Sequence, residues 1–382
     1  MKTLRIAFTG GGTGGHIYPL LAVAQEVKKM SEQRFNGRVS LYYLGAPGMY
    51  GGVIAQSGIK IISLISFKMR RYFSVANIID IIKLPFAFAQ AFFKMLFLMP
   101  DAVFSKGGSG ALAVVFAAWI FRIPIFVHDS DSVPGSTNVW SFRFAHRVGL
   151  SFSRALTYAP QAKSAVVGNP IREIFFARDP ELTQEKAKRM FGIEPNLPLV
   201  LVLGGSQGSE RINDFMLDCV GECVKSFSVL HQTGVENFTR VKNELAVATQ
   251  HFVPIERSRY KIIDFLQQDL MEAMMAADVI ISRAGSGAVF EIAAMGKPAI
   301  LIPLPESAND HQRYNAYEYA KVGACVVMEE DNLSPTLFFS QLNTLITDST
   351  KYQRMAQAAQ AFSKPDAARL IAQELLSLAS EA

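Results

Sequence analysis

Two glycine-rich segments, residues 10–16 and 204–209, each follow an apolar run and precede a helical pattern. Glycines allow the backbone to turn sharply and bring N–H groups close to an anion, and the N-terminus of the following helix adds a positive dipole. One such loop is a weak signal. Two of them, one in each half of the chain, predict two nucleotide-type α/β domains that share a cleft and act on a sugar nucleotide.

The first loop also fits the GxGxxG spacing of a dinucleotide-binding fold, which needs an acidic residue after the second strand to hold a ribose. The expected second strand, residues 40–44, runs instead into Gly45, Ala46 and Pro47. A nicotinamide cofactor is therefore disfavoured, and we expect no cofactor. His16 ends the loop at the start of a helix, where it takes a proton from an acceptor hydroxyl, binds phosphate, or only hydrogen-bonds to the loop.

A second cluster, residues 282–291, combines a strand end, a small-residue turn and a helix. Glu291 falls on the second turn of that helix among apolar neighbours, and a carboxylate accepts both hydroxyls of a ribose. We therefore expect Glu291 to bind the ribose of a donor rather than to be a surface charge. Gln312 follows Pro303 and Pro305 in the first turn of a helix and could bond sugar hydroxyls, although an N-capped surface helix has the same pattern.

A third glycine loop, residues 106–110, follows an apolar strand and either holds an anionic acceptor or forms only a tight turn. Farther on, Asp129 and Asp131 form a DxD, a pattern through which a metal bridges a diphosphate in one class of glycosyltransferases. This DxD lies in the half that lacks Glu291, and glycine loops with helix dipoles stabilise a leaving diphosphate without a metal. We therefore expect no metal site.

The segment 67–97 begins with basic residues and continues, from residue 85, as a helix that is apolar on almost every side. Gln90 and Lys94 fall on one narrow stripe of this helix, which Lys83 extends. Such a helix is usually buried, whereas the adjacent basic residues and the excess of aromatics fit an anionic membrane interface. Both interpretations stay open, and part of the segment could serve each role.

Length and composition set the broad class. The 382 residues are too many for one ordinary core, and a chain that is 50% hydrophobic and 19% charged is not disordered. The three cysteines show no CxxC pattern, which is typical of a reduced, cytoplasmic protein. We expect no signal peptide and no membrane span, because no apolar run reaches ~18–20 residues. The net charge of +5 fits an anionic membrane surface, and nucleic-acid-binding signatures are absent.

The three loops need a scaffold of strands and helices. Continuous apolar strands joined by helical crossovers predict an α/β fold whose parallel sheets are covered on both faces. In the first half we expect strands at residues 5–9, 40–44, 59–63, 102–105, 125–128 and 147–151, and helices at 19–30, 85–99 and 110–121. In the second half we expect strands from residue 199 and at 228–232, 260–264, 279–282, 299–302 and 324–328, and helices at 181–191 and 366–380.

Four motifs together resemble the MurG family, the UDP-N-acetylglucosamine:lipid I N-acetylglucosaminyltransferases of peptidoglycan synthesis, and the resemblance extends over essentially the whole chain. The motifs are residues 11–16, 168–172, 204–208 and 283–291. The resemblance implies a GT-B fold of two Rossmann-like domains. Residues 1–167 would bind the acceptor and the membrane, residues 168–364 would bind UDP-N-acetylglucosamine, and the helix within 365–382 would pack back on the first domain.

The resemblance also implies roles for individual residues. Arg172, Phe265 and Leu266 would surround the uracil ring. Donor binding would use Thr13, Gly14, Gly15, Arg172, Ser206, Gln207, Phe265, Leu266, Arg283, Gly285, Glu291 and Gln312. Acceptor binding would use Lys106, Gly107, Gly108, Ser109 and Asn138. Trp119 and Arg122, with residues 67–97, resemble an apolar patch ringed by basic residues.

The chain departs from the family pattern on the acceptor side. The family usually reads His-Glu-Gln-Asn where this chain reads His128-Asp129-Ser130-Asp131. Ser109 stands where the family usually has an aromatic residue. These differences affect acceptor contacts rather than the class of donor. A further difference near the phosphates is Ala288, where a threonine is usual.

The implied reaction is an inverting, metal-independent transfer of N-acetylglucosamine from UDP-GlcNAc to the C4 hydroxyl of the muramoyl sugar in lipid I, forming lipid II. The enzyme would be peripheral, on the cytoplasmic side of the plasma membrane. The catalytic base would be His16, Asp129 or Asp131, with His16 preferred because its pKa suits neutral pH. The alternatives are transfer to another lipid, epimerisation of UDP-GlcNAc, and a non-catalytic scaffold that binds UDP-GlcNAc.

Overall fold

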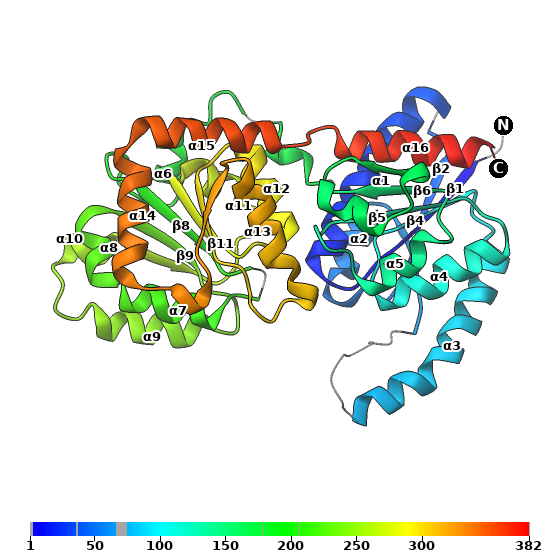
Figure 1. The fold of residues 1–382 in the computed structure, drawn as a ribbon, viewed down its shortest axis with the longest axis horizontal. Coiled ribbons are helices and arrows are strands. Elements are labelled where there is room, and N and C mark those ends of the chain that lie inside the picture. The colour runs from blue at the N-terminus through cyan, green and yellow to red at the C-terminus, as the bar shows by residue number, and fades with distance from the viewer. Residues whose placement is uncertain (1–2, 36, 66–74, 178, 206, 382) are drawn as a thin grey trace. The chain divides into compact units, whose positions relative to one another are not determined.

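The computed structural model describes residues 3–35, 37–65, 75–177, 179–205 and 207–381. Its contacts divide the chain into two compact units, Met1–Arg172 with Lys364–Ala382 and Glu173–Ser363 (Figure 1). Each unit is built on one parallel sheet with helices on both faces, so the predicted α/β class with two parallel sheets is confirmed. Within the described ranges, no helix is long and apolar enough to cross a membrane.

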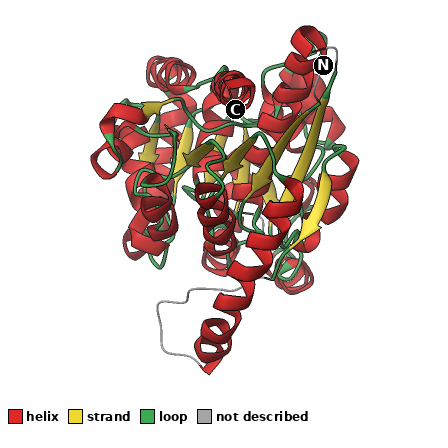
Figure 2. Cartoon of the chain, turned by 90° about the vertical axis from the view of Figure 1, so that its right-hand side faces the viewer, coloured by secondary structure: helices red, strands yellow, loops and turns green. Residues whose placement is uncertain are grey.

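The sheet of the first unit has the strand order β3-β2-β1-β4-β5-β6-β7. Helices cover both of its faces, which explains why its strands read as apolar runs (Figure 2). The six strands predicted in this half are confirmed to within two residues at each end, and only the three-residue β7 was missed. The strands are β1 (Leu4–Thr9), β2 (Val39–Gly45), β3 (Lys60–Ser63), β4 (Ala102–Ser105), β5 (Ile125–Asp129), β6 (Arg147–Leu150) and β7 (Ser164–Val166).

Two buried clusters hold helices to the two faces of this sheet. On one face, α1 and the C-terminal helix α16 pack together through Leu20 and Leu375. On the other face, α3 and α4 pack through Met95 and Val114. The helices of the unit are α1 (Gly14–Phe35), α2 (Gly51–Gln56), α3 (Val75–Leu98), α4 (Ser109–Ile120), α5 (Ser136–Phe142) and α16 (Ala367–Glu381), with 3₁₀ turns η1 (Gly48–Tyr50), η2 (Ser153–Tyr158) and η3 (Gln161–Lys163).

Two helices of this unit begin earlier than predicted, and each contains a proline. We expected starts at residues 19 and 85, but α1 begins at Gly14 and α3 at Val75. A proline inside a helix removes one backbone hydrogen bond and crowds the preceding turn, so proline is more typical of the first turn of a helix. In α1 and α3 the helix continues through Pro19 and Pro85.

The sheet of the second unit has the order β10-β9-β8-β11-β12-β13, again entirely parallel in its pairings. Its strands are β8 (Leu199–Leu203), β9 (Ser228–Gln232), β10 (Tyr260–Ile263), β11 (Val279–Ser282), β12 (Ala299–Leu301) and β13 (Cys325–Val327). The predicted strands are therefore confirmed to within a residue or two. The helices are α6 (Gln184–Met190), α7 (Glu210–Asp218), α8 (Val220–Ser226), α9 (Phe238–Ala248), α10 (Pro254–Ser258), α11 (Leu270–Ala276), α12 (Ser286–Met295), α13 (His311–Lys321), α14 (Pro335–Thr347) and α15 (Ser349–Phe362), with turns η4 (Glu173–Phe175), η5 (Ala308–Asp310) and η6 (Glu330–Asn332).

Both sheets reverse their strand order at one point. In the first sheet β1 lies between β2 and β4, and in the second β8 lies between β9 and β11. In parallel sheets of this kind, ligands bind at the carboxyl ends of the strands where the order reverses. The loops that follow β1 and β4, and those that follow β8 and β11, are therefore the places to look for a site.

Candidate active site

In the first unit, two glycine loops meet at the point of reversal. A Cβ on Gly108 would lie 2.9 Å from the Cα of Gly11, so neither loop has room for a side chain there. Gly107 and Gly108 also have φ of +88° and +91°, a conformation that L side chains rarely adopt. A Cβ on Gly107 would lie 2.4 Å from Oδ1 of Asn138. The glycines therefore let the loop after β4 approach both the first loop and α5.

Asp129 ends β5 beside these loops and is buried. Its Oδ2 accepts a hydrogen bond of 2.6 Å from Nδ2 of Asn138, and its Oδ1 accepts one of 2.9 Å from the backbone N–H of Asp131. Burial, followed by the nearby charge of Asp131, raises the pKa of Asp129 to about 6. A carboxylate with this pKa is ionised at neutral pH and is a stronger base than an ordinary aspartate.

His16 lies in the first turn of α1 and bonds to its own loop, with 2.9 Å between Nδ1 and Oγ1 of Thr13. Desolvation, followed by repulsion from the ammonium of Lys106, lowers the pKa of His16 to about 4. The reason given for preferring His16, a pKa that suits neutral pH, is therefore wrong. A neutral imidazole with so low a pKa accepts a hydrogen bond but has little tendency to take a proton.

Lys106 occupies an unexpected position in this unit. Its side chain is 1% exposed and its Nζ bonds to three protein groups, Nδ1 of His128 at 2.7 Å, Oδ1 of Asn169 at 3.4 Å and Oγ of Ser130. The resemblance assigned Lys106 to acceptor binding, but its ammonium lies inside the protein. Ser109, also assigned to the acceptor, is half-buried and begins α4.

In the second unit, the loop after β8 is compressed against the turn that follows β9. A Cβ on Gly208 would lie 2.1 Å from the carbonyl oxygen of Thr233, and Gly208 has a φ of +78°. Asn213 of α7 fixes this turn, because its Nδ2 donates a 3.0 Å hydrogen bond to the Thr233 carbonyl. Gln232 then ties the loop to the next strand, since it donates to the Gly205 carbonyl at 2.9 Å and accepts from the N–H of Leu266 at 3.0 Å.

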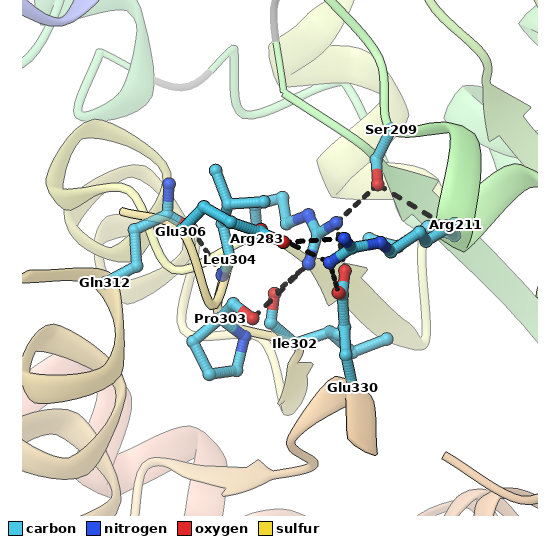
Figure 3. Close-up of polar contacts among 10 residues, drawn as sticks. Ser209, Arg211, Arg283, Ile302, Pro303, Leu304, Glu306, Gln312 and Glu330 are labelled. Carbon is cyan, nitrogen blue, oxygen red and sulfur yellow. Dashed lines mark hydrogen bonds and ion pairs between the residues drawn. The ribbon is translucent and has the colours of Figure 1, made fainter. Parts of the chain in front are cut away.

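Arg283 follows β11 and is only 7% exposed. Its guanidinium donates to Oγ of Ser209 at 2.6 Å and to the carbonyls of Ile302 and Pro303 at 3.2 and 3.3 Å, and it forms an ion pair with Glu330 (Figure 3). The resemblance assigned Arg283 to donor binding, whereas these contacts make it the residue that joins four segments around the donor loop.

Ser209 and Gln312 show what Arg283 holds in place. Ser209 caps α7, where its Oγ accepts from the N–H of Ile212 at 3.4 Å. Gln312, in the first turn of α13, accepts at Oε1 from the N–H of Leu304 at 3.1 Å (Figure 3). The loop with Leu304 follows directly on the carbonyls that Arg283 binds. One buried guanidinium therefore links the helix that follows the glycine loop to the segment that carries Gln312.

The other residues assigned to the donor have differing positions. Glu291 is half-buried on α12, which begins one residue after Gly285. Phe265 and Leu266 follow β10. Arg172 belongs to the first unit, where its guanidinium lies 5.1 Å from the ring centroid of Tyr18, so neither unit alone brings it beside Phe265. Gln207 lies in the described part of the glycine loop, Thr13, Gly14 and Gly15 lie at the start of α1, and Ser206 lies outside the described residues.

Sequence reasoning missed Glu330 and Arg211. Arg211 is exposed and pairs with Glu306 at 2.6 Å and with Glu330, which also pairs with buried Arg283 (Figure 3). The signal available was weak, because Glu330 stands in a run of acidic residues that resembles an ordinary surface turn. Arg211 and Glu330 are 119 residues apart in the sequence, so no local pattern predicts that they pair.

One surface of α3 is apolar and exposed. Ala87, Ala91 and Met95 are buried against the unit. The opposite side, with the end of α4, presents Ile82, Leu84, Phe86, Phe93, Leu96, Phe97, Trp119 and Ile120 to solvent, with exposed Lys83, Lys94 and Arg122 among them; we call this the α3 surface. Helix α3 is thus partly buried and partly exposed. The basic residues before residue 75 lie outside the described part of the chain.

The described residues contain no group of three or more His, Cys, Asp or Glu side chains placed to hold a metal ion. Asp129 is instead engaged by Asn138 and by the backbone of Asp131.

The comparisons with known proteins agree across both units. The glycosyltransferase family 28 N-terminal domain matches residues 6–150, and the family 28 C-terminal domain matches residues 199–371. The UDP-N-acetylglucosamine--N-acetylmuramyl-(pentapeptide) pyrophosphoryl-undecaprenol N-acetylglucosamine transferase of Treponema denticola is 33% identical, over 97% of both chains. The enzyme of that name from Caldicellulosiruptor saccharolyticus is also 33% identical, over 98% of this chain and 99% of its own.

Solved structures share the fold. The crystal structure of Acinetobacter baumannii MurG has a TM-score of 0.72 at 24% identity and covers 98% of this chain and 99% of its own. The UDP-GlcNAc 2-epimerase of Neisseria meningitidis, bound to UDP-GlcNAc, has a TM-score of 0.69 at 14% identity and covers 98% and 100%. The GT-B fold expected from the sequence is confirmed. The fold alone does not separate a transferase from an epimerase, but the relatives at 33% identity are named as transferases.

Proposed function

This chain belongs to the family of UDP-N-acetylglucosamine--N-acetylmuramyl-(pentapeptide) pyrophosphoryl-undecaprenol N-acetylglucosamine transferases, within glycosyltransferase family 28. From that premise we propose that it transfers N-acetylglucosamine from UDP-GlcNAc to the C4 hydroxyl of the muramoyl sugar in lipid I, forming lipid II. The observation that carries the proposal is the identity of 33% to enzymes of that name over nearly their full length. The glycine loops at both points of strand reversal support it.

The donor would bind to the second unit. The compressed loop after β8 leads into α7, and the turn after β11 leads into α12, so the N-termini of both helices would present positive dipoles to a diphosphate. These dipoles would stabilise the leaving UDP without a metal ion. Glu291 would accept the hydroxyls of the ribose, Gln312 would bond the sugar, and Phe265 with Leu266 would contact the uracil.

The acceptor would bind to the first unit, with Asp129 as the base. The C4 hydroxyl attacks the anomeric carbon as the bond to UDP breaks on the opposite side, and its proton passes to Asp129. Inversion follows, because there is one displacement. Asp129 is preferred to His16 because its pKa of about 6 lies nearer neutral pH than the pKa of about 4 at His16. Asn138 would hold the carboxylate in position from α5.

We propose that the α3 surface rests on the cytoplasmic face of the plasma membrane. Exposed apolar side chains with basic residues among them bind an interface by apolar burial and by attraction to anionic lipid. Phe97 is 83% exposed and Phe93 56%. A peripheral position there would bring the sugar head of a membrane-anchored lipid to the first unit. No nucleic-acid partner is proposed.

The function is tested by product analysis. The protein is incubated with UDP-GlcNAc and a short-chain lipid I analogue in excess EDTA, and UDP release and disaccharide-lipid formation are measured. Disaccharide-lipid under chelation is the expected result. An epimerised sugar, a glycosylated glyceride when diacylglycerol is supplied, or rescue only by Mg²⁺ or Mn²⁺ would each contradict a different part of the proposal. Binding of UDP-GlcNAc with no product under any of these conditions would favour the scaffold interpretation.

Replacing Glu291 tests the ribose contact. We expect Glu291→Ala to raise the KM for UDP-GlcNAc with little change in kcat, because the ribose is bound alike in the ground and transition states. The loss of charge-assisted hydrogen bonds corresponds to about 1.5–3 kcal/mol, or roughly ten- to a hundredfold in KM. Glu222→Ala, which removes an exposed glutamate of α8 in the same unit, is the control. An unchanged affinity for UDP would exclude the ribose contact.

Liposome flotation tests the membrane proposal. We expect Phe93→Asp/Phe97→Asp to lose most of its binding to vesicles that contain anionic lipid, because charge replaces apolar burial at the interface. Both side chains are already exposed, so the fold is retained. Val247→Asp/Val253→Asp, which changes two exposed apolar residues of the second unit, is the matched control and floats like the wild type. Equal flotation of both variants would rule out the α3 surface as the contact.

A further inference from the structure

Lys106 is a buried cation whose hydrogen-bonding capacity is used by the protein. It follows β4 directly, and its three acceptors come from the end of β5, the residues after β5, and the segment that precedes the second unit. A lysine ammonium has three N–H donors and no acceptor. Its contacts with His128, Ser130 and Asn169 therefore account for all three donors and leave none for a substrate.

The contacts of His128 fit a protonated Lys106. Nε2 of His128 lies 2.9 Å from the carbonyl oxygen of Gly168, and a carbonyl only accepts, so Nε2 carries the hydrogen. Nδ1 of the neutral ring is then an acceptor, and it lies 2.7 Å from Nζ of Lys106. Burial, followed by repulsion from Lys106, holds the pKa of His128 well below its ordinary value, which keeps the ring neutral. The charged lysine and the neutral imidazole thus fit each other.

The charged and titratable groups around Lys106 come from three places. His16 faces it from α1, His128 and Asp129 from β5, and Asp131 from the residues after β5. Burial lowers the pKa of Lys106 to about 8, although Asp129 and Asp131 oppose the shift. A buried ammonium in turn favours the ionised form of a nearby carboxylate and the neutral form of a nearby imidazole.

We propose that Lys106 is a positioning residue for the transfer reaction: its buried ammonium fixes His128, Ser130 and Asn169, and it keeps Asp129 ionised and His16 neutral beside the acceptor hydroxyl. This inference rests on the proposed function, and it differs from a role in acceptor binding because Lys106 has no donor left for the acceptor. The attacking hydroxyl would meet two hydrogen-bond acceptors, Asp129 and His16, and Asp129 would take its proton. Removal of the charge would alter both groups without removing any group that touches substrate.

The proposal predicts specific changes in the pH profile. Without the ammonium, Asp129 and His16 both become easier to protonate, so the acid limb of kcat/KM moves to higher pH. Burial and the charge of Asp131 influence the pKa of Asp129 more than Lys106 does, so we expect a shift of less than about one pH unit. Wild-type activity should also fall above about pH 8, because deprotonated Lys106 has two N–H donors and no longer fixes all three of its acceptors. This alkaline limb should be missing without the lysine.

The experiment uses the full chain with Lys106→Met and Lys106→Gln. Both variants remove the charge, but methionine also removes the hydrogen-bond donors, whereas glutamine keeps an amide that can donate. The control is Lys188→Met, because Lys188 is also buried, at 5% exposure, and pairs with Asp278 at 2.8 Å in the second unit. Rates are measured from pH 5 to 9.5, from about one unit below the pKa of Asp129 to about one and a half units above that of Lys106. Chemical denaturation of the full chain reports whether each variant is folded.

A second readout separates this inference from the proposed function. Histidine-selective ¹⁵N NMR follows the six imidazoles, with His16 and His128 assigned from His16→Gln and His128→Gln. We expect the pKa of His16 to rise in both Lys106 variants, but not in Lys188→Met, whether or not lipid I is the acceptor. In the wild type, the ¹⁵N shifts of His128 should change near pH 8 as Lys106 deprotonates, and this needs no variant.

The outcomes are distinct. The proposal is supported if, in the Lys106 variants, the acid limb of kcat/KM moves to higher pH and the pKa of His16 rises. Unchanged limbs and an unchanged His16 titration in a folded Lys106 variant overturn it, and so does a wild-type His128 that shows no change between about pH 7 and 9. If the wild type makes no disaccharide-lipid while His16 and His128 titrate as expected, the proposed function fails and the electrostatic role of Lys106 stands.

Discussion

Asp129→Asn is expected to lower kcat by about 10²–10⁴-fold, the range that a positioned general base contributes. Asn138 and the backbone of Asp131 fix the direction of the Asp129 carboxylate at the end of β5. The amide keeps the size of the side chain but cannot take up a proton. The measurement is kcat at saturating UDP-GlcNAc with a short-chain lipid I analogue, and UDP binding in the second unit should remain at the wild-type value.

The pH profile and two further variants make this prediction specific. Wild-type kcat/KM should fall as pH drops through about 6, because the protonated form of Asp129 is no base. Asp129→Glu restores the residue usual in the family and should retain most of the activity, whereas His16→Gln should lose less than Asp129→Asn. If Asp129→Asn retained activity within tenfold of the wild type with the same acid limb, the base would have to be another group.

The strands and glycine loops could be predicted because their signals are local. A run such as residues 199–203 is apolar throughout, since helices cover both faces of the sheet, and glycines must stand where a turn follows at once. The same reasoning failed at Pro19 and Pro85, because a proline inside a helix and a proline at its start look alike in sequence. The three residues of β7 carry too short a pattern to be read.

The roles of Lys106 and Arg283 could not be predicted, because each depends on partners far along the chain. Asn169 is 63 residues from Lys106, and Ser209 is 74 residues from Arg283. Sequence identified both as basic residues beside glycine or small-residue turns, which fits anion binding equally well. The pKa of His16 was misjudged because it is lowered first by burial and then by the ammonium of Lys106, and both depend on the folded structure.

The two units use a buried cation in the same place. Lys106 directly follows β4 and Arg283 directly follows β11, and these strands are the corresponding neighbours of β1 and β8 in the two sheets. Lys106 binds His128 of β5, Ser130 after it and Asn169. Arg283 binds residues that follow β8, β12 and β13. Lys106 and Arg283 differ in how they respond to pH, because a guanidinium stays charged at every working pH, whereas a buried ammonium can lose its proton. pH-sensitivity is therefore expected from the first unit.

The second large effect is expected at Arg283. Arg283→Met leaves the Glu330 carboxylate, Ser209 and the carbonyls of Ile302 and Pro303 without their buried donor. Breaking a buried ion pair from one side costs about 3–5 kcal/mol in the free energy of unfolding. Chemical denaturation measures this loss, and calorimetry should show UDP affinity reduced by about tenfold or more, since the helix cap of Ser209 and the segment before Gln312 lose their common anchor.

Two controls separate the stability of the unit from the placement of its loops. Arg211→Met removes the exposed partner of Glu330 and should leave the free energy of unfolding nearly unchanged, because exposed ion pairs contribute little. Arg283→Met/Glu330→Leu removes both buried charges and should recover much of the lost stability. UDP affinity should stay low in that double variant, because no guanidinium joins Ser209 to the Pro303 carbonyl. Full recovery of UDP affinity there would show that Arg283 acts on stability alone.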